Sequence, residues 1–143
     1  AVIQGAVRTL HPETRDMVED RVRSIIEGVC KGYGSSCSIR YNRLYPVLVN
    51  AKAQTDIAVG VASSMVGDLK VITEADPVMG SEDFAYMLEK KPGAYIVIGN
   101  GDGPNSCMAH NPGYDFNDEI IGLGMEYWCR LVESQLPANG TDS

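Results

Sequence analysis

The sequence has no apolar run close to the roughly 20 residues that cross a bilayer, so no transmembrane helix is expected. It also lacks a cationic start followed by an apolar stretch, which would mark a secretory signal. These absences predict a soluble, cytoplasmic protein without a membrane partner. The first residue, Ala1, fits two origins equally well: removal of an initiator Met, or the cut end of a longer chain.

Basic residues are scarce, with 12 Lys and Arg against 19 Asp and Glu and a net charge of −7. Such a field repels phosphate backbones, so nucleic acid is not expected as a partner. The charge is also uneven. Residues 1–50 hold seven basic and five acidic side chains, whereas residues 51–143 hold five and fourteen. This change of sign predicts two units with different roles.

The four cysteines are too irregularly spaced to form a disulfide framework in a chain of 143 residues, so we expect reduced thiols. Several catalytic motifs are missing as well. The sequence contains no G-x-S-x-G nucleophile elbow, no H-E-x-x-H metal motif and no G-x-G-x-x-G dinucleotide motif. These absences disfavour a serine hydrolase, a self-contained metalloprotease of that type and a dinucleotide-binding enzyme.

The periodicity of hydrophobic residues predicts an α/β fold. Apolar residues recur at helical spacing after Pro12, in a helix that ends at the glycines 32 and 34, and β-prone segments flank it at 2–9 and 38–45. Further along, we predict the following elements: a helix over 57–66, a short strand over 71–73, a helix start at 81–83, a strand over 94–98 and a helix over 120–136. The apolar strand 94–98 is expected at the centre of a mixed sheet under helices.

Residues 99–117 form a long loop rich in Gly, Asn, Asp and Pro, and such loops in compact domains are usually functional. His110 lies in this loop, and a functional role and a purely structural role fit its position equally well. His11, beside Pro12, is better explained as a solvated turn residue. Cys107 and His110 together could supply two zinc ligands, but no second pair is present. The count of ligands therefore predicts that this chain alone does not hold a complete hydrolytic metal centre.

Four segments together carry a family resemblance. They read G-A-V-R-T-L at 5–10 (followed by P-E-T-R), M-G-S-E-D-F-A at 79–85, G-A-Y-I-V-I-G at 93–99 and H-N-P-G-Y-D-F-N-D at 110–118. In this order and spacing the sequence resembles the C-terminal part of the metal-dependent amidohydrolases related to hippurate hydrolase, indole-acetyl-amino-acid hydrolases, aminoacylase and glutamate carboxypeptidase. The likeness covers nearly the whole chain.

The resemblance implies a bilobed subunit with an α/β catalytic domain, which holds two divalent metals such as zinc or manganese, and an inserted α+β lid domain through which two subunits dimerise. Residues 1–48 correspond to the C-terminal part of the inserted dimerisation domain. Residues 49–143 correspond to the C-terminal part of the metal-binding catalytic domain. This agrees with the change of charge near residue 50.

The resemblance also implies roles for single residues. His110 matches the one metal ligand of this region, although Met-Ala-His stands where Leu-His is more usual. Arg8 matches a position whose guanidinium grips the free carboxylate of the substrate, although an exposed strand arginine is the alternative. Gly80 and Ser81 match a turn that lines the substrate site. The remaining ligands and the general base belong to an N-terminal half that is absent here, so the metal site is incomplete and no catalytic residue is assigned.

Glu82 and Asp83 have two interpretations. Two acids at a helix start are most often simple capping residues. Alternatively, one of them orients His110 through its second ring nitrogen, as metal-bound imidazoles commonly require.

The function expected is hydrolysis of the amide bond of N-acyl amino acids by a dimeric metallo-amidohydrolase, of which this chain is an incomplete portion and inactive by itself. The alternative is a non-catalytic, truncated module that keeps a surface for self-association. The two differ in metal affinity, because a complete enzyme holds its metal tightly and a chain with one imidazole does not.

Overall fold

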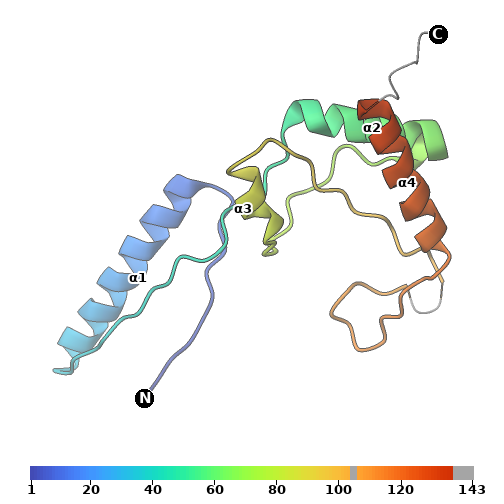
Figure 1. The fold of residues 1–143 in the computed structure, drawn as a ribbon. Coiled ribbons are helices and arrows are strands. Elements are labelled where there is room, and N and C mark those ends of the chain that lie inside the picture. Colours follow the sequence, from blue (N-terminus) through green and yellow to red (C-terminus); the bar gives the residue numbers. More distant parts are fainter. Residues whose placement is uncertain (104–105, 137–143) are drawn as a thin grey trace, which may run out of the picture. The chain divides into compact units, whose positions relative to one another are not determined.

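A computed structural model describes residues 1–103 and 106–136 of the chain (Figure 1). The elements in this part are helical. In chain order they are α1 (Pro12–Gly32), α2 (Lys52–Val66), the short 3-10 helix η1 (Asp68–Lys70), α3 (Phe84–Leu88) and α4 (Ile120–Gln135). None of the described helices is both long enough and apolar enough to cross a bilayer.

The chain divides into two compact units, each interrupted once. Unit 1 comprises Ala1–Val49 and Ala75–Lys91, and it contains α1 and α3. Unit 2 comprises Asn50–Glu74 and Pro92–Ser143, and it contains α2, η1 and α4. The last seven residues of the predicted second domain, 137–143, lie outside the described part of the chain.

The prediction of an α/β fold is wrong, because no strand forms within residues 1–103 or 106–136. The segments predicted as strands are extended chain that belongs to no ladder. They are residues 2–9, 38–45, 71–73 and 94–98. A β-strand exists only where its N–H and C=O groups pair with those of a neighbouring strand. Neither the mixed sheet nor the α+β layer of a lid domain is therefore present in the described residues.

Helix α1 confirms the first predicted helix. It begins at Pro12, which needs no N–H partner in the first turn, and it is followed by Gly34 at φ 63°, a backbone conformation that glycine adopts without strain. Its apolar face is nevertheless uncovered: Ile25 is 62% exposed and Val29 is 55% exposed. No sheet forms in the described residues that could cover this face.

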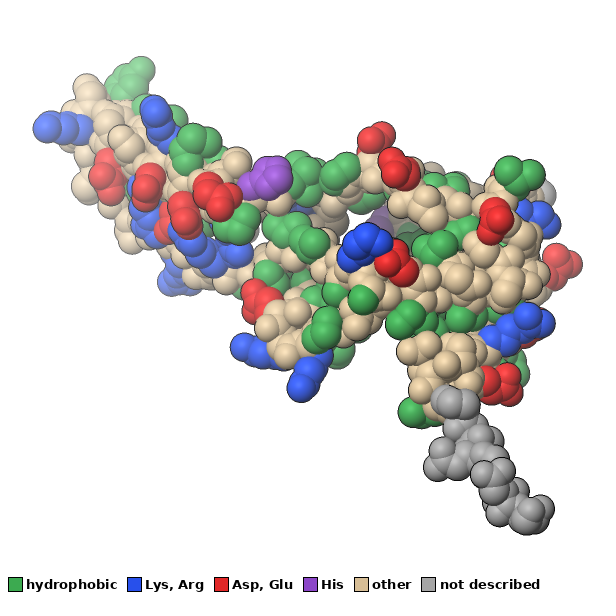
Figure 2. Space-filling model, turned by 90° about the horizontal axis from the view of Figure 1, so that it is seen from above, with side chains coloured by type: hydrophobic (Ala, Val, Ile, Leu, Met, Phe, Trp, Pro, Cys, Tyr) green, Lys and Arg blue, Asp and Glu red, His purple; other side chains and the backbone are tan. Residues whose placement is uncertain are grey.

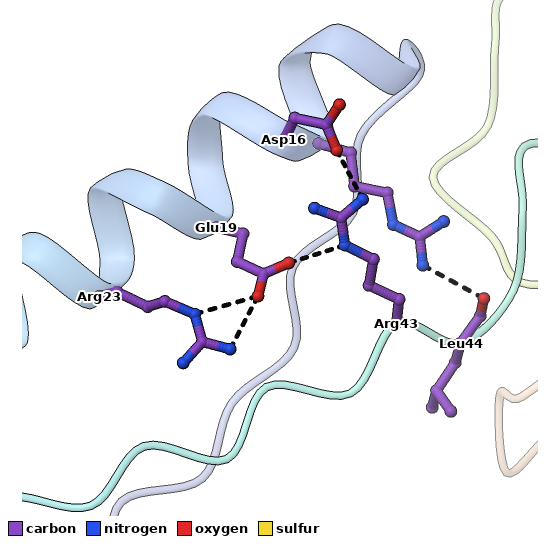
Figure 3. Close-up of polar contacts among 6 residues, drawn as sticks. Asp16, Glu19, Arg23, Arg43 and Leu44 are labelled. Carbon is purple, nitrogen blue, oxygen red and sulfur yellow. Dashed lines mark hydrogen bonds and ion pairs between the residues drawn. The ribbon is translucent and has the colours of Figure 1, made fainter.

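Charged side chains tie the extended segment after α1 back to the helix (Figure 3). The Glu19 carboxylate accepts hydrogen bonds from Nε and Nη2 of Arg23, at 3.0 and 2.8 Å, and from Nε of Arg43, at 2.7 Å. Arg43 also pairs with Asp16 one turn earlier, and Arg15 donates to the carbonyl oxygen of Leu44 at 3.2 Å. Glu19 is the centre of this network, with a side chain only 14% exposed.

We expect the Glu19 network to make the stability of unit 1 depend on pH. Hydrogen bonds from Arg23 and Arg43 lower the pKa of Glu19 below its ordinary value of 4.5. A depressed pKa in the folded state gives stability that is present above pH 4.5 and is lost as the pH falls through the lowered pKa. Glu19→Gln should therefore unfold at lower urea concentration than the wild type at pH 7, and this difference should shrink as the pH falls below 4.5 and through the lowered pKa of Glu19.

A matched control is Asp20→Asn, because Asp20 is an exposed carboxylate on the same helix without a hydrogen bond or ion pair to any described residue. Its unfolding midpoint should differ little from that of the wild type at every pH. A Glu19→Gln difference that stays constant from pH 7 to pH 3 would contradict a role for the ionised carboxylate.

Unit 2 is organised by the packing of α4 against α2 (Figure 1). Its buried residues are Ala58 and Val61 on α2 and Tyr127 on α4, and the Tyr127 ring meets that of Trp128 edge-on with centroids 5.5 Å apart. Burial raises the pKa of Tyr127. Both helices confirm the predicted ones, although α2 begins at Lys52, five residues earlier than expected.

The segment 94–98, predicted as a buried central strand, is held by a side chain instead of a neighbouring strand. The Asn50 carboxamide accepts a hydrogen bond from the Tyr95 N–H at 2.8 Å and donates to the Tyr95 carbonyl oxygen at 2.9 Å. Next to this pair, the N–H of Ala51 donates to the carbonyl oxygen of Gly93, two residues before Tyr95, at 2.9 Å. The segment is not buried on both faces, since Val97 is 83% exposed.

Large hydrophobic side chains are exposed in both units, and Figure 2 shows them interspersed with acidic and basic groups on the face in view. Among the described residues, only four hydrophobic side chains are buried. They are Ala58, Val61, Ala85 and Tyr127. Because burial of apolar surface is the main favourable term in folding, the described residues form a small core for a chain of this length.

Candidate functional site

Two asparagine side chains close the base of the loop between Ile98 and α4. Asn100 donates from Nδ2 to the carbonyl oxygen of Asp115 at 2.8 Å, and its Oδ1 accepts from the Asn117 N–H at 2.8 Å. Asn117 donates from Nδ2 to the Asn100 carbonyl oxygen at 3.4 Å, and its Oδ1 accepts from the Glu119 N–H at 3.1 Å. We call this pair, Asn100 and Asn117, the asparagine clasp.

His110 lies within the loop that the clasp closes, in an unusual backbone conformation. Its φ is 72°, and it is the one described non-glycine residue with a positive φ. The turn around it is held by hydrogen bonds of the next residue: the Asn111 N–H donates to Met108, and the Asn111 side chain accepts from the Gly113 N–H at 2.9 Å. The Asn111 carbonyl oxygen accepts from Tyr114, also at 2.9 Å.

The left-handed conformation of His110 has an expected cost in stability, because a Cβ atom disfavours it. We expect His110→Gly to be more stable than His110→Ala by about 1 kcal/mol, since only glycine adopts this conformation freely. Both variants lack the imidazole, so the comparison isolates the backbone. Urea unfolding of the two variants measures the difference, and equal midpoints would show that the loop does not hold φ at this value in solution.

The His110 imidazole is exposed and makes no hydrogen bond to a described residue, so both ring nitrogens are accessible to a ligand. His110 fits one metal-ligand position by its chemistry. The described residues nevertheless contain no group of three or more His, Cys, Asp or Glu side chains that could hold a metal ion. None of the four cysteines is in a disulfide.

Arg8, predicted to bind the substrate carboxylate, lies in the extended segment before α1. Its side chain is exposed and makes no hydrogen bond or ion pair to a described residue. By contrast, Arg15, Arg23 and Arg43 of the same unit are all engaged with α1 or the segment beside it. The Arg8 guanidinium therefore keeps all its donors available for an anion.

The predicted substrate turn and the two acids after it form one stretch just before α3. The Gly80 N–H donates to the Val78 carbonyl oxygen at 2.8 Å, which closes a three-residue turn. Glu82 has a local role, because its Oε1 accepts from the Phe84 N–H at 3.2 Å in the first turn of α3. Asp83 occupies the N-cap position of α3 without a side-chain capping bond.

The predicted residues are divided between the two units. Arg8 and the stretch 80–83 belong to unit 1, and His110 belongs to unit 2. The second histidine, His11, is exposed at the N-cap of α1, where its carbonyl oxygen accepts from the Arg15 N–H. This agrees with the interpretation of His11 as a turn residue.

Sequence reasoning missed the asparagine clasp. A signal was present, because Asn100 lies two residues after the apolar segment 94–98 and Asn117 stands three residues before α4, so the two flank the loop. Asparagine is common in turns for local reasons, however, and nothing in the sequence indicates that these two bind each other across 17 positions.

Two hollows of unit 2 lie between α2 and α4 and contain none of the predicted residues. The first is lined by Ile57, Gly60, Val61, Ser64, Arg130, Glu133, Ser134 and Gln135. The second adds Ala94 and Ile96 from the extended segment to residues of the two helices. Both are open, and neither gathers the carboxylates and imidazoles that hydrolytic chemistry requires.

Comparison of the sequence with those of known proteins identifies its relatives. A model of a protein family described as "Peptidase family M20/M25/M40" matches residues 4–134. The chain is 31% identical to the hippurate hydrolase of Campylobacter jejuni over 132 residues, which are 92% of the chain and 34% of that protein. It is 29% identical to the N-acetylcysteine deacetylase of Bacillus subtilis over 132 residues, which are 92% of the chain and 33% of that protein.

A further relative is the thermostable carboxypeptidase 2 of Saccharolobus solfataricus, 31% identical over 127 residues that cover 87% of the chain and 31% of the relative. The chain thus spans about a third of the length of the curated relatives it matches. No solved structure matches the chain. These similarities confirm the resemblance that the sequence motifs carry.

Proposed function

Since this chain belongs to peptidase family M20/M25/M40, we propose that it supplies the C-terminal part of a metal-dependent hydrolase that cleaves the amide bond of N-acyl amino acids. The observation that carries the proposal is the family match over residues 4–134, which includes both Arg8 and His110. Hippurate and N-acetyl amino acids are the substrates proposed, and the names of two relatives, a hippurate hydrolase and an N-acetylcysteine deacetylase, favour them.

For the domains, we propose that residues 1–48 end an inserted lid domain through which two subunits dimerise, and that residues 49–143 belong to the metal-binding domain. The division of the chain at Val49 and Asn50 supports a boundary near this point, although residues 75–91 group with unit 1. The exposed apolar face of α1 supports a role in association.

His110 would hold one of two divalent metals, such as zinc or manganese, together with ligands that the rest of the protein contributes. When bound, the metals supply Lewis-acid activation of water and of the amide carbonyl. Arg8 would bind the free carboxylate of the amino acid, and the backbone at Gly80 and Ser81 would line the substrate site. These roles follow from the resemblance, and the availability of the His110 and Arg8 side chains supports two of them.

Glu82 or Asp83 would orient His110 through its second ring nitrogen. The local hydrogen bond of Glu82 to the Phe84 N–H makes Asp83 the better candidate. If the proposal holds, a Glu82→Gln, Asp83→Asn pair lowers metal affinity in the complete protein about 10- to 100-fold. Unchanged affinity, measured by competition with a chelator, would leave the two acids with capping roles only.

The first experiment is to sequence the template upstream of the codon for Ala1. An open frame of one to two domains' length, with several Cys, His, Asp and Glu including a Glu pair, would supply the missing ligands. The resulting complete protein should then hydrolyse hippurate, lose this activity on chelation and regain it when zinc or manganese is added. A start codon immediately before Ala1 would make this a short protein without the missing ligands, and the proposal that it is part of a longer hydrolase would be abandoned.

The alternative function is a non-catalytic module that keeps a surface for self-association. The exposed apolar side chains of α1, including Ile25 and Val29, favour it. Metal affinity separates the two proposals: the complete hydrolase retains its metals through dialysis, whereas a module with one imidazole does not. Sedimentation of the 143-residue chain measures the self-association that both proposals expect.

A further inference from the structure

The loop that carries His110 contains no helix or strand in its described residues, 99–103 and 106–119. Between Ile98 and α4 the chain forms turns and bends only, in the residues that the structure describes. His110 itself is exposed and in a left-handed conformation, so neither burial nor a regular element fixes its position. A metal ligand must nevertheless be held close to its working geometry, because a site assembled from several segments binds tightly only when its ligands are preorganised.

The asparagine clasp can hold the loop, and with it His110, in a defined conformation. Asn100 joins both sides of the loop base, since it donates to the Asp115 carbonyl oxygen and accepts from the Asn117 N–H, each at 2.8 Å. Asn117 also accepts a hydrogen bond from the N–H of Glu119, the N-cap residue of α4, at 3.1 Å. The loop ends are therefore fixed to each other and to the helix that packs in unit 2.

We infer that Asn100 and Asn117 are positioning residues that hold the loop so that His110 can bind its metal. The inference rests on the proposed function, because it takes His110 as a ligand. Neither asparagine contacts the metal in this account. They restrict the conformations of the loop before the metal binds. The free energy of metal binding then does not have to offset the entropy lost when a flexible loop is ordered.

Two variants separate the bonds of the clasp. Asn100→Ala removes both side-chain bonds of Asn100, whereas Asn100→Asp keeps the acceptor for the Asn117 N–H and replaces the donor to Asp115 by a carboxylate oxygen, which cannot donate to that carbonyl oxygen. Met108→Ala is the matched control, because Met108 lies in the same loop, is 83% exposed and contributes to the turn through its backbone alone.

The first measurement is amide hydrogen exchange of the 143-residue chain. The Asn117 N–H bonds directly to Asn100, and the Gly113 and Tyr114 N–H groups bond within the turn after His110. Asn100→Ala should speed the exchange of all three, Asn100→Asp should speed it less, and Met108→Ala should leave it unchanged. Unchanged exchange in Asn100→Ala would overturn the inference without bearing on the role of His110.

The second measurement is metal affinity in the complete protein, by chelator competition. Asn100→Ala should weaken binding about ten-fold, and excess metal should restore kcat, because His110 is still present. His110→Ala should weaken binding more strongly, and excess metal should not restore kcat. If His110→Ala has no effect on affinity, the proposed function fails. If His110→Ala weakens binding and Asn100→Ala does not, the inference about the clasp alone is overturned.

Discussion

Replacement of His110 by alanine in the complete protein is expected to lower kcat/KM for hippurate by more than about a hundred-fold. Loss of a partner that merely orients a metal ligand costs 10- to 100-fold, and removal of the ligand itself should cost more. The loss should be in kcat, because the substrate carboxylate is bound elsewhere. Steady-state kinetics with a measured metal content for each preparation give the result.

The matched control is His11→Ala, which removes the other histidine of the chain. His11 is exposed at the N-cap of α1 and makes no side-chain capping bond, so its removal should leave kcat/KM unchanged. Equal activity of the His110→Ala and wild-type proteins at equal metal content would contradict the assignment of His110 as a ligand.

The second large effect is expected at Arg8, where alanine should raise the KM for hippurate about 30- to 150-fold with little change in kcat. A hydrogen bond to a charged group contributes about 1.5–3 kcal/mol, and a loss of 2–3 kcal/mol corresponds to this range. Arg8→Lys should recover only part of the loss, because an ammonium group lacks the planar pair of donors that matches a carboxylate.

The substrate provides an internal control for Arg8. Hippuramide has the same acyl group but no carboxylate, so its KM should be nearly the same for Arg8→Ala and wild type. Arg40→Ala is the matched variant, because Arg40 is an exposed arginine of the same unit without a bond to a described residue. A similar loss for hippurate and hippuramide would indicate a role for Arg8 in folding instead of recognition.

Helices were predictable from the sequence because their signals are local. Pro12 and the glycines 32 and 34 mark the ends of α1, and Gly67 at φ 83° follows α2 at the predicted place. The predicted helix 120–136 corresponds to α4, Ile120–Gln135. Each i to i+4 hydrogen bond joins residues that are close in sequence, so periodicity and end signals within one segment suffice.

Strands were not predictable in the same way, because a strand requires a partner. Segment 94–98 has the composition of a buried strand, yet its observed backbone partner is the Asn50 side chain, 45 residues away. Nothing within the segment indicates which distant residue will meet its N–H and C=O groups. Segment 38–45 is also held by a distant element, because Arg43 forms ion pairs with Asp16 and Glu19 of α1.

The residues of the candidate site could be predicted from the sequence, but the hydrogen bonds around them could not. The motifs around residues 8, 80 and 110 were enough to indicate the family, and the family match over residues 4–134 confirms it. The positions of Arg8 and His110 within these motifs are read from the sequence alone. Their hydrogen-bond partners, or the lack of them among the described residues, could be seen only in three dimensions.

The sequence by itself thus determined the family and the long helices α1, α2 and α4, since both depend on the kind and spacing of residues along one segment. The tertiary structure alone decided that the predicted strands join no ladder among the described residues, that His110 takes a left-handed conformation and that Asn100 and Asn117 close its loop. The physical reason is the same in each case: these features depend on hydrogen bonds between residues whose meeting is fixed by the whole fold and not by their neighbours in sequence.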